Sequence, residues 1–525
     1  MAHGQGVGCA GCQEECDQNK NKLLMLRKIR VTLAILFFAA VTLLFLDFTG
    51  TIHAWLGWVA KIQFLPALLA LNTGVVIALV LLTLLFGRVY CSVICPLGVF
   101  QDVVSWLSAR RRKKKYRFTY SRPLTWLRWT VLVLFVAAML AGVGSFVALL
   151  DPYSAYGRMA SNLLAPLYGW GNNALAWMAE RMDSYAFYDT TVWLRSLPTF
   201  IIAIVTLVVI VVLAWRGGRT YCNTVCPVGT VLGFLSRFAL FRVSIDADKC
   251  KECGLCARKC KASCIDVKNH TVDHSRCVDC MDCLDACRHD AIHYKVYKPS
   301  TAPVADGKDK GSDGGVDSSR RTFLTVTAAV AASTALKAQE KKVDGGLAVI
   351  EDKVAPKRAT PIVPPGALSA RHFAQHCTGC QLCVSVCPNE VLRPSTDLLK
   401  LMQPEMSYER GYCRLECNRC SEVCPAGAIK PISVADKSST QIGHAVWIKK
   451  NCVPLTDGVE CGNCARHCPT GAIQMVPSNP ADPSSVKIPV VNDERCIGCG
   501  ACENLCPARP FSAIYVEGCE THHLV

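Results

Sequence analysis

Cysteine spacing is the feature of this chain with the most chemical content. Of its 33 cysteines, 24 fall into six blocks of four. Disulfide-rich secreted domains are usually short and irregularly spaced, so regular blocks in a 525-residue chain favour metal ligation. Thiolates at these spacings can hold an iron–sulfur cluster or zinc.

The first two blocks repeat the C-x2-C-x2-C-x3-C pattern of bacterial two-cluster ferredoxins. In that pattern three cysteines on one loop bind one cubane, and the fourth begins a helix that reaches the other cubane. We therefore expect two [4Fe–4S] clusters, one on Cys250, Cys253, Cys256 and Cys287, and one on Cys277, Cys280, Cys283 and Cys260. Zinc is the alternative, but zinc sites seldom show this motif twice in succession.

Three residues of this region depart from the usual pattern. Lys261 and Arg288 replace the proline that normally follows the fourth cysteine, so the motif does not fix the local geometry or the reduction potential. Cys264 is an additional cysteine, which we expect to be a packed thiol and not a ligand.

The C-terminal part carries four more blocks, and each of them ends in Cys-Pro. Two blocks keep the standard spacing, one has an extra residue in its first gap, and one has a long first gap. Sixteen cysteines can hold four further [4Fe–4S] clusters. The expected ligands are Cys377, Cys380, Cys383, Cys387, Cys413, Cys417, Cys420, Cys424, Cys452, Cys461, Cys464, Cys468, Cys496, Cys499, Cys502 and Cys506. Cys519 is left over.

A second kind of cysteine motif is repeated earlier in the chain. Residues 88–98 and 219–229 both read R-x-Y-C-x-x-x-C-P-x-G, and each follows an apolar segment. If the two halves pack about a pseudo-twofold axis, four thiols converge at the cytoplasmic surface and can hold a seventh cluster or another thiophilic metal. The alternative is a set of thiols that bind nothing. The four residues are Cys91, Cys95, Cys222 and Cys226.

A trio of cysteines lies near the N-terminus. Cys9, Cys12 and Cys16 have a spacing that could ligate a metal, but a fourth ligand is missing nearby. A polar tail with incidental thiols is the equal alternative.

The elements that must position these motifs are apolar helices. The chain is 51% hydrophobic with a mean hydropathy of +0.26, and the apolar excess is concentrated in the first 215 residues. Four runs are about long enough to cross a membrane as helices, namely Val31–Phe48, Phe64–Phe86, Leu124–Leu150 and Leu197–Trp215.

The basic residues follow these predicted spans. The net charge is +16, and the basic runs flank the apolar segments, which is typical of cytoplasmic anchors and argues against nucleic-acid binding. We therefore expect the N-terminus in the cytoplasm, with spans two and four both returning there.

A twin-arginine sequence lies in the middle of the chain. Ser319-Arg320-Arg321-Thr322-Phe323-Leu324 precedes a weakly apolar run and resembles a Tat export signal. The alternative is an ordinary amphipathic helix. Because 335–338 is not a clean cleavage site, we expect the segment to be retained as an anchor. Its position predicts iron–sulfur clusters on both sides of one membrane.

These signals predict an α-helical membrane domain of four spans plus a Tat-type helix, with two α+β bacterial ferredoxin-like domains. The expected divisions are a cysteine-containing tail at 1–24, the membrane domain at 25–243, a cytoplasmic two-cluster ferredoxin domain at 244–297, a linker at 298–319, the Tat-like helix at 320–338, a second linker at 339–366, and a periplasmic four-cluster ferredoxin domain at 367–525.

Two known families resemble the two halves. Residues 25–297 resemble the NapH-type membrane ferredoxins, through the four apolar runs, the paired Y-C-x-x-x-C-P motifs and the two-cluster block. Residues 318–515 resemble the NapG-type (MauM/NapG) Tat-exported ferredoxins, through the twin arginine and the four cysteine motifs. These are normally separate subunits of a quinol dehydrogenase, and here they look fused.

The resemblance implies a function and a partition of ligands. It implies that the membrane half oxidises quinol and that electrons reach a periplasmic reductase or c-type cytochrome, in a multi-pass protein of the bacterial inner membrane exported by the Tat translocase. It also implies that the outer two C-terminal motifs exchange their fourth cysteines, Cys387 and Cys506, and that the inner two exchange Cys424 and Cys468.

Rival functions stay open at this point. The chain could be an assembly factor or redox sensor of a respiratory enzyme, or a pure electron relay whose quinol site belongs to a partner. Nicotinamide, flavin and covalent haem sites are not indicated, because their motifs are missing from the sequence. The ionisable residues near the predicted membrane surface are more typical of interfacial anchors than of a quinol site; they are Asp47, His53, Arg128 and Asp151.

Overall fold

The computed structural model describes residues 10–47, 49–111, 118–287, 289–296 and 351–525. The predicted linker at 298–319, the Tat-like segment at 320–338, Arg288 and Cys9 lie outside these residues. Cys12 and Cys16 lie on the first helix, where the structure describes the backbone alone.

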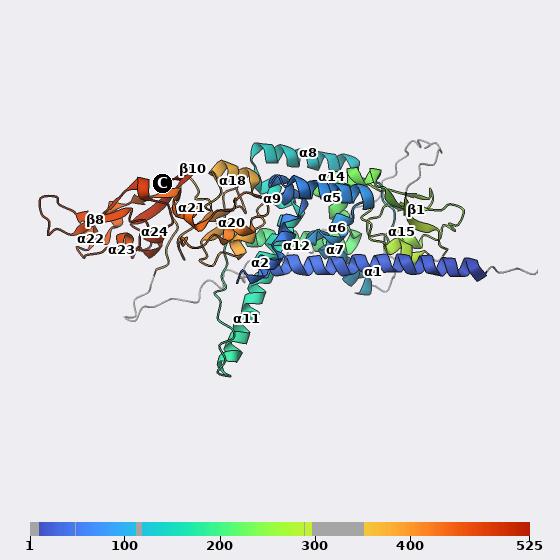
Figure 1. Ribbon diagram of the computed structural model, residues 1–525, viewed down its shortest axis with the longest axis horizontal. Helices are drawn as coiled ribbons and strands as arrows, with labels where there is room; N and C mark the ends of the chain where they lie inside the picture. The colour runs from blue at the N-terminus through green and yellow to red at the C-terminus, as the bar shows by residue number, and fades with distance from the viewer. Residues whose placement is uncertain (1–9, 48, 112–117, 288, 297–350) are drawn as a thin grey trace, which may run out of the picture.

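A helical domain occupies the middle of the molecule, and a small domain of short strands and helices lies at each end (Figure 1). Its helices are α1 (Ala10–Leu46), α2 (Thr51–Leu56), α3 (Trp58–Lys61), α4 (Phe64–Leu69), α5 (Thr73–Phe86), α6 (Val89–Val93), α7 (Pro96–Arg111), α8 (Thr125–Ala141), α9 (Gly144–Leu150), α10 (Pro152–Met159), α11 (Ala165–Glu180), α12 (Leu197–Gly217), α13 (Thr220–Thr224) and α14 (Pro227–Leu235). A π-helical turn, Ala160–Leu164, joins α10 to α11.

Two helices of the described residues are long and apolar enough to cross a membrane. They are the Met25–Leu46 part of α1 and the whole of α12. The second predicted span is divided into α4 and α5, because Leu71 takes a left-handed conformation (φ 53°) and Asn72 caps α5. The third is divided at Gly142 (φ 76°) into α8 and α9. Four continuous spans are therefore not confirmed.

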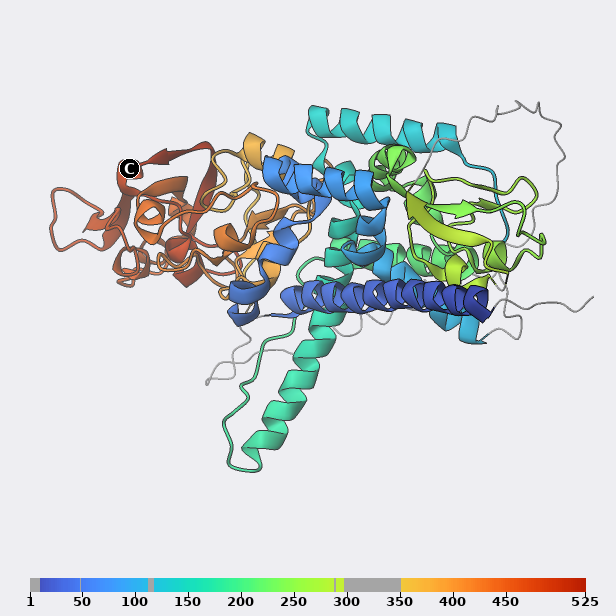
Figure 2. The same cartoon turned by 45° about the vertical axis from the view of Figure 1, so that its right-hand side comes forward.

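Helix α11 forms an arm that projects away from the body, transverse to α1 (Figures 1 and 2). The return segment is held against it by two asparagines, since Asn172 donates to the Tyr188 carbonyl at 2.8 Å and Asn173 to that of Thr190 at 2.8 Å. The segment that returns from the arm contacts the C-terminal domain through Arg195, which donates to the Val384 carbonyl at 2.9 Å.

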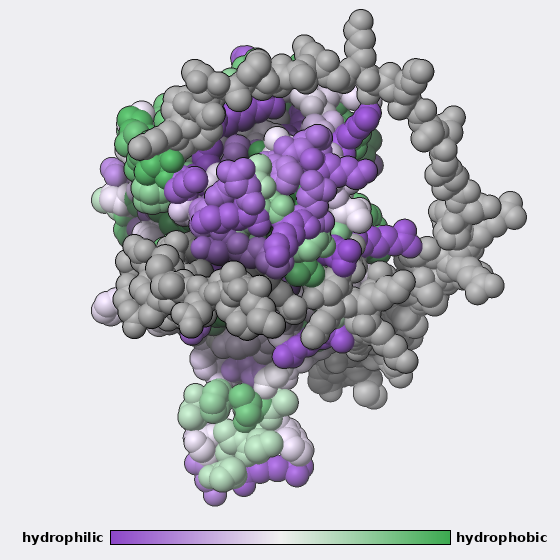
Figure 3. All heavy atoms as spheres, turned by 90° about the vertical axis from the view of Figure 1, so that its right-hand side faces the viewer, coloured by the Kyte–Doolittle hydropathy of each residue, from purple (hydrophilic) through white to green (hydrophobic). Residues whose placement is uncertain are grey.

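The first small domain follows α14. Its elements are β1 (Phe241–Ile245), α15 (Leu255–Lys259), β2 (Ile265–Asp266), β3 (Thr271–Val272), α16 (Asp282–Ala286) and β4 (Ile292–Val296). The strands form two antiparallel pairs, β1 with β4 and β2 with β3. Figure 3 shows hydrophilic side chains gathered on the face of the molecule that carries this domain.

The C-terminal domain lies at the opposite end of the helical domain (Figure 1). Its helices are α18 (Ala370–His376), α19 (Leu382–Ser385), α20 (Arg419–Val423), α21 (Val434–Ser438), α22 (Val453–Thr456), α23 (Asn463–Arg466) and α24 (Ala501–Leu505). Its strands form three antiparallel pairs, β5 (Leu392–Pro394) with β6 (Pro404–Met406), β8 (Ile473–Pro477) with β9 (Lys487–Val491), and β7 (Thr440–Trp447) with β10 (Ile514–Leu524).

The helical domain touches both small domains directly. Arg27 on α1 donates to Asp282 of the first small domain at 3.0 Å. At the other end, Asn162 donates to Gln381 of the C-terminal domain at 2.8 Å. The same helical layer therefore separates and positions the two cysteine-rich domains.

Candidate iron–sulfur centres

The two R-x-Y-C-x-x-x-C-P-x-G motifs converge in the interior of the helical domain. Cys91, Cys95, Cys222 and Cys226 are only 3–4% exposed, and their thiols interact electrostatically with one another. The predicted convergence is therefore present, and the four thiols are buried within the protein. Their predicted position at the cytoplasmic side of a membrane stays a prediction. The chain turns back after α5 and after α12, so both motifs fold into the helical layer.

The motif arginines cross between the halves. Arg88 donates to the Cys222 carbonyl at 3.2 Å, and Arg219 donates to the Cys91 carbonyl at 2.7 Å. Both guanidinium groups are fully buried. This reciprocal pair is the pseudo-twofold relation that the repeat predicts, and it brings two positive charges beside four thiols.

The remaining motif residues have steric and capping roles. A Cβ on Gly98 would lie 2.2 Å from the Cys91 carbonyl oxygen, and one on Gly229 would lie 2.4 Å from that of Cys222. Both positions therefore require glycine. The proline of each motif opens the following helix, α7 or α14, where the missing N–H costs nothing.

The motif tyrosines anchor the group to the rest of the domain. Tyr90 Oη donates to Gln63 at 3.1 Å and accepts from the Phe64 amide at 3.0 Å. Tyr221 donates to the Leu150 carbonyl at 2.8 Å, at the start of the connection to α10.

A buried ionic network joins this cysteine group to the first small domain. Asp102 on α7 accepts from Arg219 Nε at 2.9 Å and lies 3.7 Å from Lys261 Nζ, which is 2.8 Å from Asp282. Burial opposes the ionised form of Asp102, but Arg219, Lys261 and Arg30 outweigh it and hold its pKa well below the usual range. Burial likewise disfavours charged Lys261, but Asp102 and Asp282 raise its pKa.

Lys261 stands where the ferredoxin pattern has proline, and its ammonium group pairs with Asp102 and Asp282. The sequence marked it only as a missing proline, and the structure places it in contact with α7. Sequence reasoning missed Asp102 entirely. The available signal was one charged residue in the otherwise uncharged first turns of the helix that follows Cys95-Pro96.

The first small domain contains the two predicted cysteine groups. One small cavity is lined by Cys250, Cys253, Cys256 and Cys287, and another by Cys260, Cys277, Cys280 and Cys283. The second cavity has a fifth thiol, Cys264. This second group faces the helical domain, because Asp279 beside it accepts from the Arg88 amide at 2.8 Å.

The C-terminal domain pairs its motifs differently from the partition that the resemblance implied. Cys424 completes the group of Cys377, and Cys387 interacts electrostatically with Cys413 and Cys420. Cys506 completes the group of Cys452, and Cys468 that of Cys496. Neighbouring motifs therefore exchange their fourth cysteines, and the predicted outer–inner exchange is wrong.

The physical reason is local helix packing. The short helices of the four motifs pack in two pairs that are neighbours in the chain, α19 with α20 and α23 with α24. Each such pair repeats the arrangement of α15 and α16 in the first small domain.

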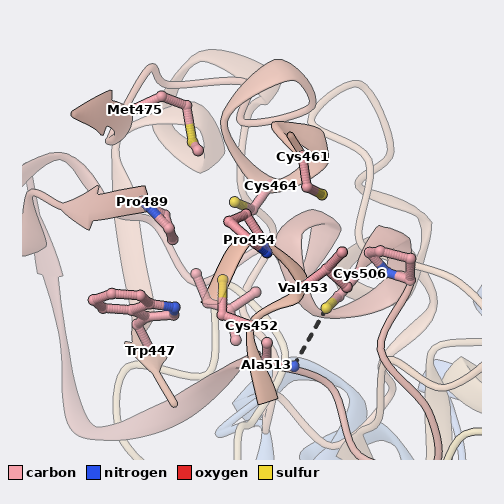
Figure 4. Close-up of a pocket in the computed structure, with 12 residues that line it drawn as sticks. Trp447, Cys452, Val453, Pro454, Cys461, Cys464, Met475, Pro489, Cys506 and Ala513 are labelled. Atoms are coloured by element: carbon pink, nitrogen blue, oxygen red, sulfur yellow. Dashed lines mark hydrogen bonds between the residues drawn. The ribbon is translucent and has the colours of Figure 1, made fainter. Parts of the chain in front are cut away.

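Figure 4 shows the group that has the longest gap between its first two cysteines. Cys452, Cys461 and Cys464 surround a cavity with Cys506, and Trp447 lies at its edge. The Ala513 amide donates to Cys506 Sγ at 3.3 Å. Similar amide-to-sulfur contacts, Ala291 to Cys287 at 3.3 Å and Gly229 to Cys226 at 3.3 Å, supply donors that stabilise thiolates.

These groups fit a cubane cluster. Each consists of thiols alone, and in five of them the thiols surround a small, apolar cavity instead of a single point. Within the described parts of the chain no three His, Cys, Asp or Glu side chains are arranged to hold one metal ion. Because all-sulfur donor sets surround a cavity, they suit [4Fe–4S] clusters better than mononuclear zinc.

Helix α10 packs against α7 and α12 of the helical domain and contacts the C-terminal domain. All eight of its residues are buried. A Cβ on Gly157 would lie 2.6 Å from the Cys380 carbonyl oxygen, and Tyr153 interacts electrostatically with Cys380 and Cys424. Asp151 caps the helix by accepting from the Ser154 amide at 2.9 Å. The helical domain is therefore closely packed against the C-terminal domain at this helix.

Of the other ionisable residues named from the sequence, Arg128 is structural, since it donates to Ser275 Oγ at 3.2 Å. Asp47 lies 3.0 Å from His53 Nδ1 and also accepts from the backbone at the start of α2. His53 Nε2 is buried without a hydrogen-bond partner in the described structure.

Family models match the same segments. A 4Fe-4S binding domain matches residues 70–115 and 199–245, the two halves of the helical domain that carry the repeated motif. A 4Fe-4S dicluster domain matches residues 376–428 and 459–509, and a second dicluster model matches residues 273–391.

Curated relatives of the chain include ferredoxin-type proteins. The methylamine utilization ferredoxin-type protein MauM of Methylobacillus flagellatus is 32% identical over 167 residues, which is 31% of this chain and 70% of the relative. The chain belongs to the MauM-type family of ferredoxin-type proteins. The ferredoxin-type protein NapF of Escherichia coli is 29% identical over 31% of this chain and 89% of its own length.

A longer match is to an uncharacterized protein of Methanocaldococcus jannaschii, which is 25% identical over 54% of this chain and 91% of its own length. No solved structure matches the chain. The domains and the relatives agree on the class: this is an iron–sulfur electron-transfer protein of the 4Fe-4S ferredoxin type.

Proposed function

We propose that the chain is a membrane-bound quinol dehydrogenase module that delivers electrons to a periplasmic reductase or c-type cytochrome. The observation that carries the proposal is the placement of the cysteine groups. One group is buried inside the helical domain, and the ferredoxin domains hold the others at its two ends (Figure 1).

[4Fe–4S] clusters, when bound, accept and donate single electrons, which is how two-electron oxidation of a quinol can be divided. The protein supplies the surroundings. Burial of Cys91 and Cys222 excludes water, and the buried Arg88 and Arg219 offset the negative charge that four thiolates bring into the interior.

Membrane placement is supported by α1 and α12, whose apolar lengths suit a bilayer. Under this placement the domain at 244–297 is cytoplasmic and the domain at 367–525 is periplasmic. The twin arginine at Arg320-Arg321 supplies the export route, and the chain would then be a fusion of a NapH-type and a NapG-type protein.

The proton of the quinol needs an acceptor, and His53 has the suitable geometry. Asp47 holds its Nδ1 at 3.0 Å, which fixes the ring and leaves Nε2 free to accept. The pair lies where α1 ends, which places it at the outer membrane surface in the proposed topology.

The quinol reaction is tested with the purified full chain. Clusters are reconstituted anaerobically, a menaquinol analogue is added, and reduction is followed by EPR. The wild type is expected to be reduced promptly, and H53Q at least tenfold more slowly. H467Q, at an exposed histidine of the C-terminal domain, is the matched control and should behave as wild type. No reduction of the wild type without a partner contradicts the dehydrogenase and leaves an electron relay.

Export is tested separately in cells. Arg320 and Arg321 are both replaced by Lys, and protease is added to the outside of spheroplasts. The wild-type C-terminal domain should be digested and that of the variant protected. A C-terminal domain that is still accessible in the variant contradicts Tat export.

A further inference from the structure

The two cysteine groups of the first ferredoxin domain differ by one thiol. Four residues after Cys260 the chain has Cys264, and four residues after Cys287, the equivalent position of the other group, it has Ala291. Cys264 precedes β2 and Ala291 precedes β4, and each lines the cavity of its own group. The local fold is therefore the same at both places, and only the side chain changes.

Cys264 is in contact with two of the expected ligands. It is 1% exposed, and its Sγ lies 3.5 Å from Cys260 Sγ. Its thiol also interacts electrostatically with that of Cys277. A ligand thiolate carries no proton, so when a cluster is bound only Cys264 can donate in these contacts. In the sister group, Cys287 Sγ accepts a hydrogen bond from the Ala291 amide at 3.3 Å, and the Ala291 side chain offers no donor.

Donors to ligand sulfurs stabilise the reduced, more negative state of a cluster and so raise its reduction potential. We propose that Cys264 is a positioning residue that makes the group of Cys260, Cys277, Cys280 and Cys283 the more easily reduced of the two. The shift equals the difference in strength of this hydrogen bond between the reduced and the oxidised cluster. A whole hydrogen bond contributes about 0.5–1.5 kcal/mol, so the ratio of reduced to oxidised cluster should change by up to about tenfold.

The location of this group gives the difference a consequence. Its neighbour Asp279 accepts from the Arg88 amide at 2.8 Å, so it is the group next to the central cysteines. The sister group is on the outer side, where Cys253 is exposed. An added electron would therefore reside preferentially at the group that faces the helical domain. The inference requires clusters in this domain and does not require quinol oxidation, so each can fail without the other.

The test is an EPR-monitored redox titration of the full chain with dithionite and mediators. C264A is expected to move one four-iron component to lower potential, with a change of up to about tenfold in its ratio of reduced to oxidised cluster at a given potential. C264S keeps a donor and should restore most of the wild-type potential. The reciprocal variant A291C should move a different component upward.

Each other outcome overturns the proposal. An unchanged titration for C264A means that the thiol only fills space. Loss of about four iron atoms per chain in C264A makes Cys264 a ligand or a structural requirement instead of a donor. If C264A does not assemble, A291C still decides, because an unmoved component in that variant removes the proposed effect.

Discussion

Replacement of Gly98 by alanine should disrupt the central cysteine group without changing any cysteine. The new Cβ would lie 2.2 Å from the Cys91 carbonyl oxygen, about 1.2 Å inside an ordinary contact of 3.4 Å, and 2.5 Å from Arg219 Nη1. Neither neighbour can yield easily, because that carbonyl accepts from Arg219 at 2.7 Å and both residues are buried.

The cost follows from these contacts. Overpacking of this kind destabilises the fold by about 1–3 kcal/mol. Loss of the hydrogen bond from the charged Arg219 costs about 1.5–3 kcal/mol more. A destabilisation of about 2.5–6 kcal/mol is a large fraction of a typical folding free energy. The relief available is movement of Cys91, which would carry its thiol out of the group.

The assay is iron content per chain together with the temperature at which cluster absorbance is lost. G98A should lose about four iron atoms per chain, or retain them with clearly lower thermal stability. Because the halves are pseudo-symmetric, G229A should behave in the same way. G171A on α11 is the control, since no atom lies within 4 Å of its added Cβ. If G98A keeps the iron and the stability of G171A, the steric reasoning is refuted.

Two further predictions concern the C-terminal domain. Because Cys377 and Cys424 share a group, the double variant C377S/C424S should lose about four iron atoms and C377S/C506S about eight; the reverse result would restore the outer–inner exchange. Burial, with His523 nearby, lowers the pKa of His522 to about 4. The unfolded chain then binds more protons than the folded one between about pH 6.5 and 4, so the folded state should lose stability when the pH falls from 7 to 5. In H522Q this loss should be smaller than in the wild type, by on the order of 1–2 kcal/mol. Thermal unfolding of both proteins at both pH values checks this, and equal losses contradict it.

Most of the expected ligands, and two of the four predicted membrane spans, follow from local sequence. The cysteine spacing grouped three thiols on each loop, and five of these trios each line one cavity in the structure. The thiols of the sixth, Cys413, Cys417 and Cys420, interact electrostatically. The repeat around Cys91 and Cys222 predicted their convergence, because two copies of one motif after two apolar segments can pack about a common axis. Apolar length identified α1 and α12.

Helix continuity was less predictable. Hydropathy averages over a window, so it gave one segment where Leu71 and Gly142 each break the backbone with a positive φ. The burial of the central group was not predictable either, because spacing alone does not show that the thiols on α6 and α13 are enclosed by other helices of the domain.

The fourth ligand of each C-terminal group was decided only by tertiary structure. Spacing fixes the three cysteines of a loop, because they lie within a few residues, but the fourth comes from whichever motif packs alongside. That partner depends on helix contacts, such as α19 with α20, that no local pattern encodes. The role of Cys264 has the same origin: the sequence shows an extra cysteine, and only the fold brings its sulfur to 3.5 Å from Cys260.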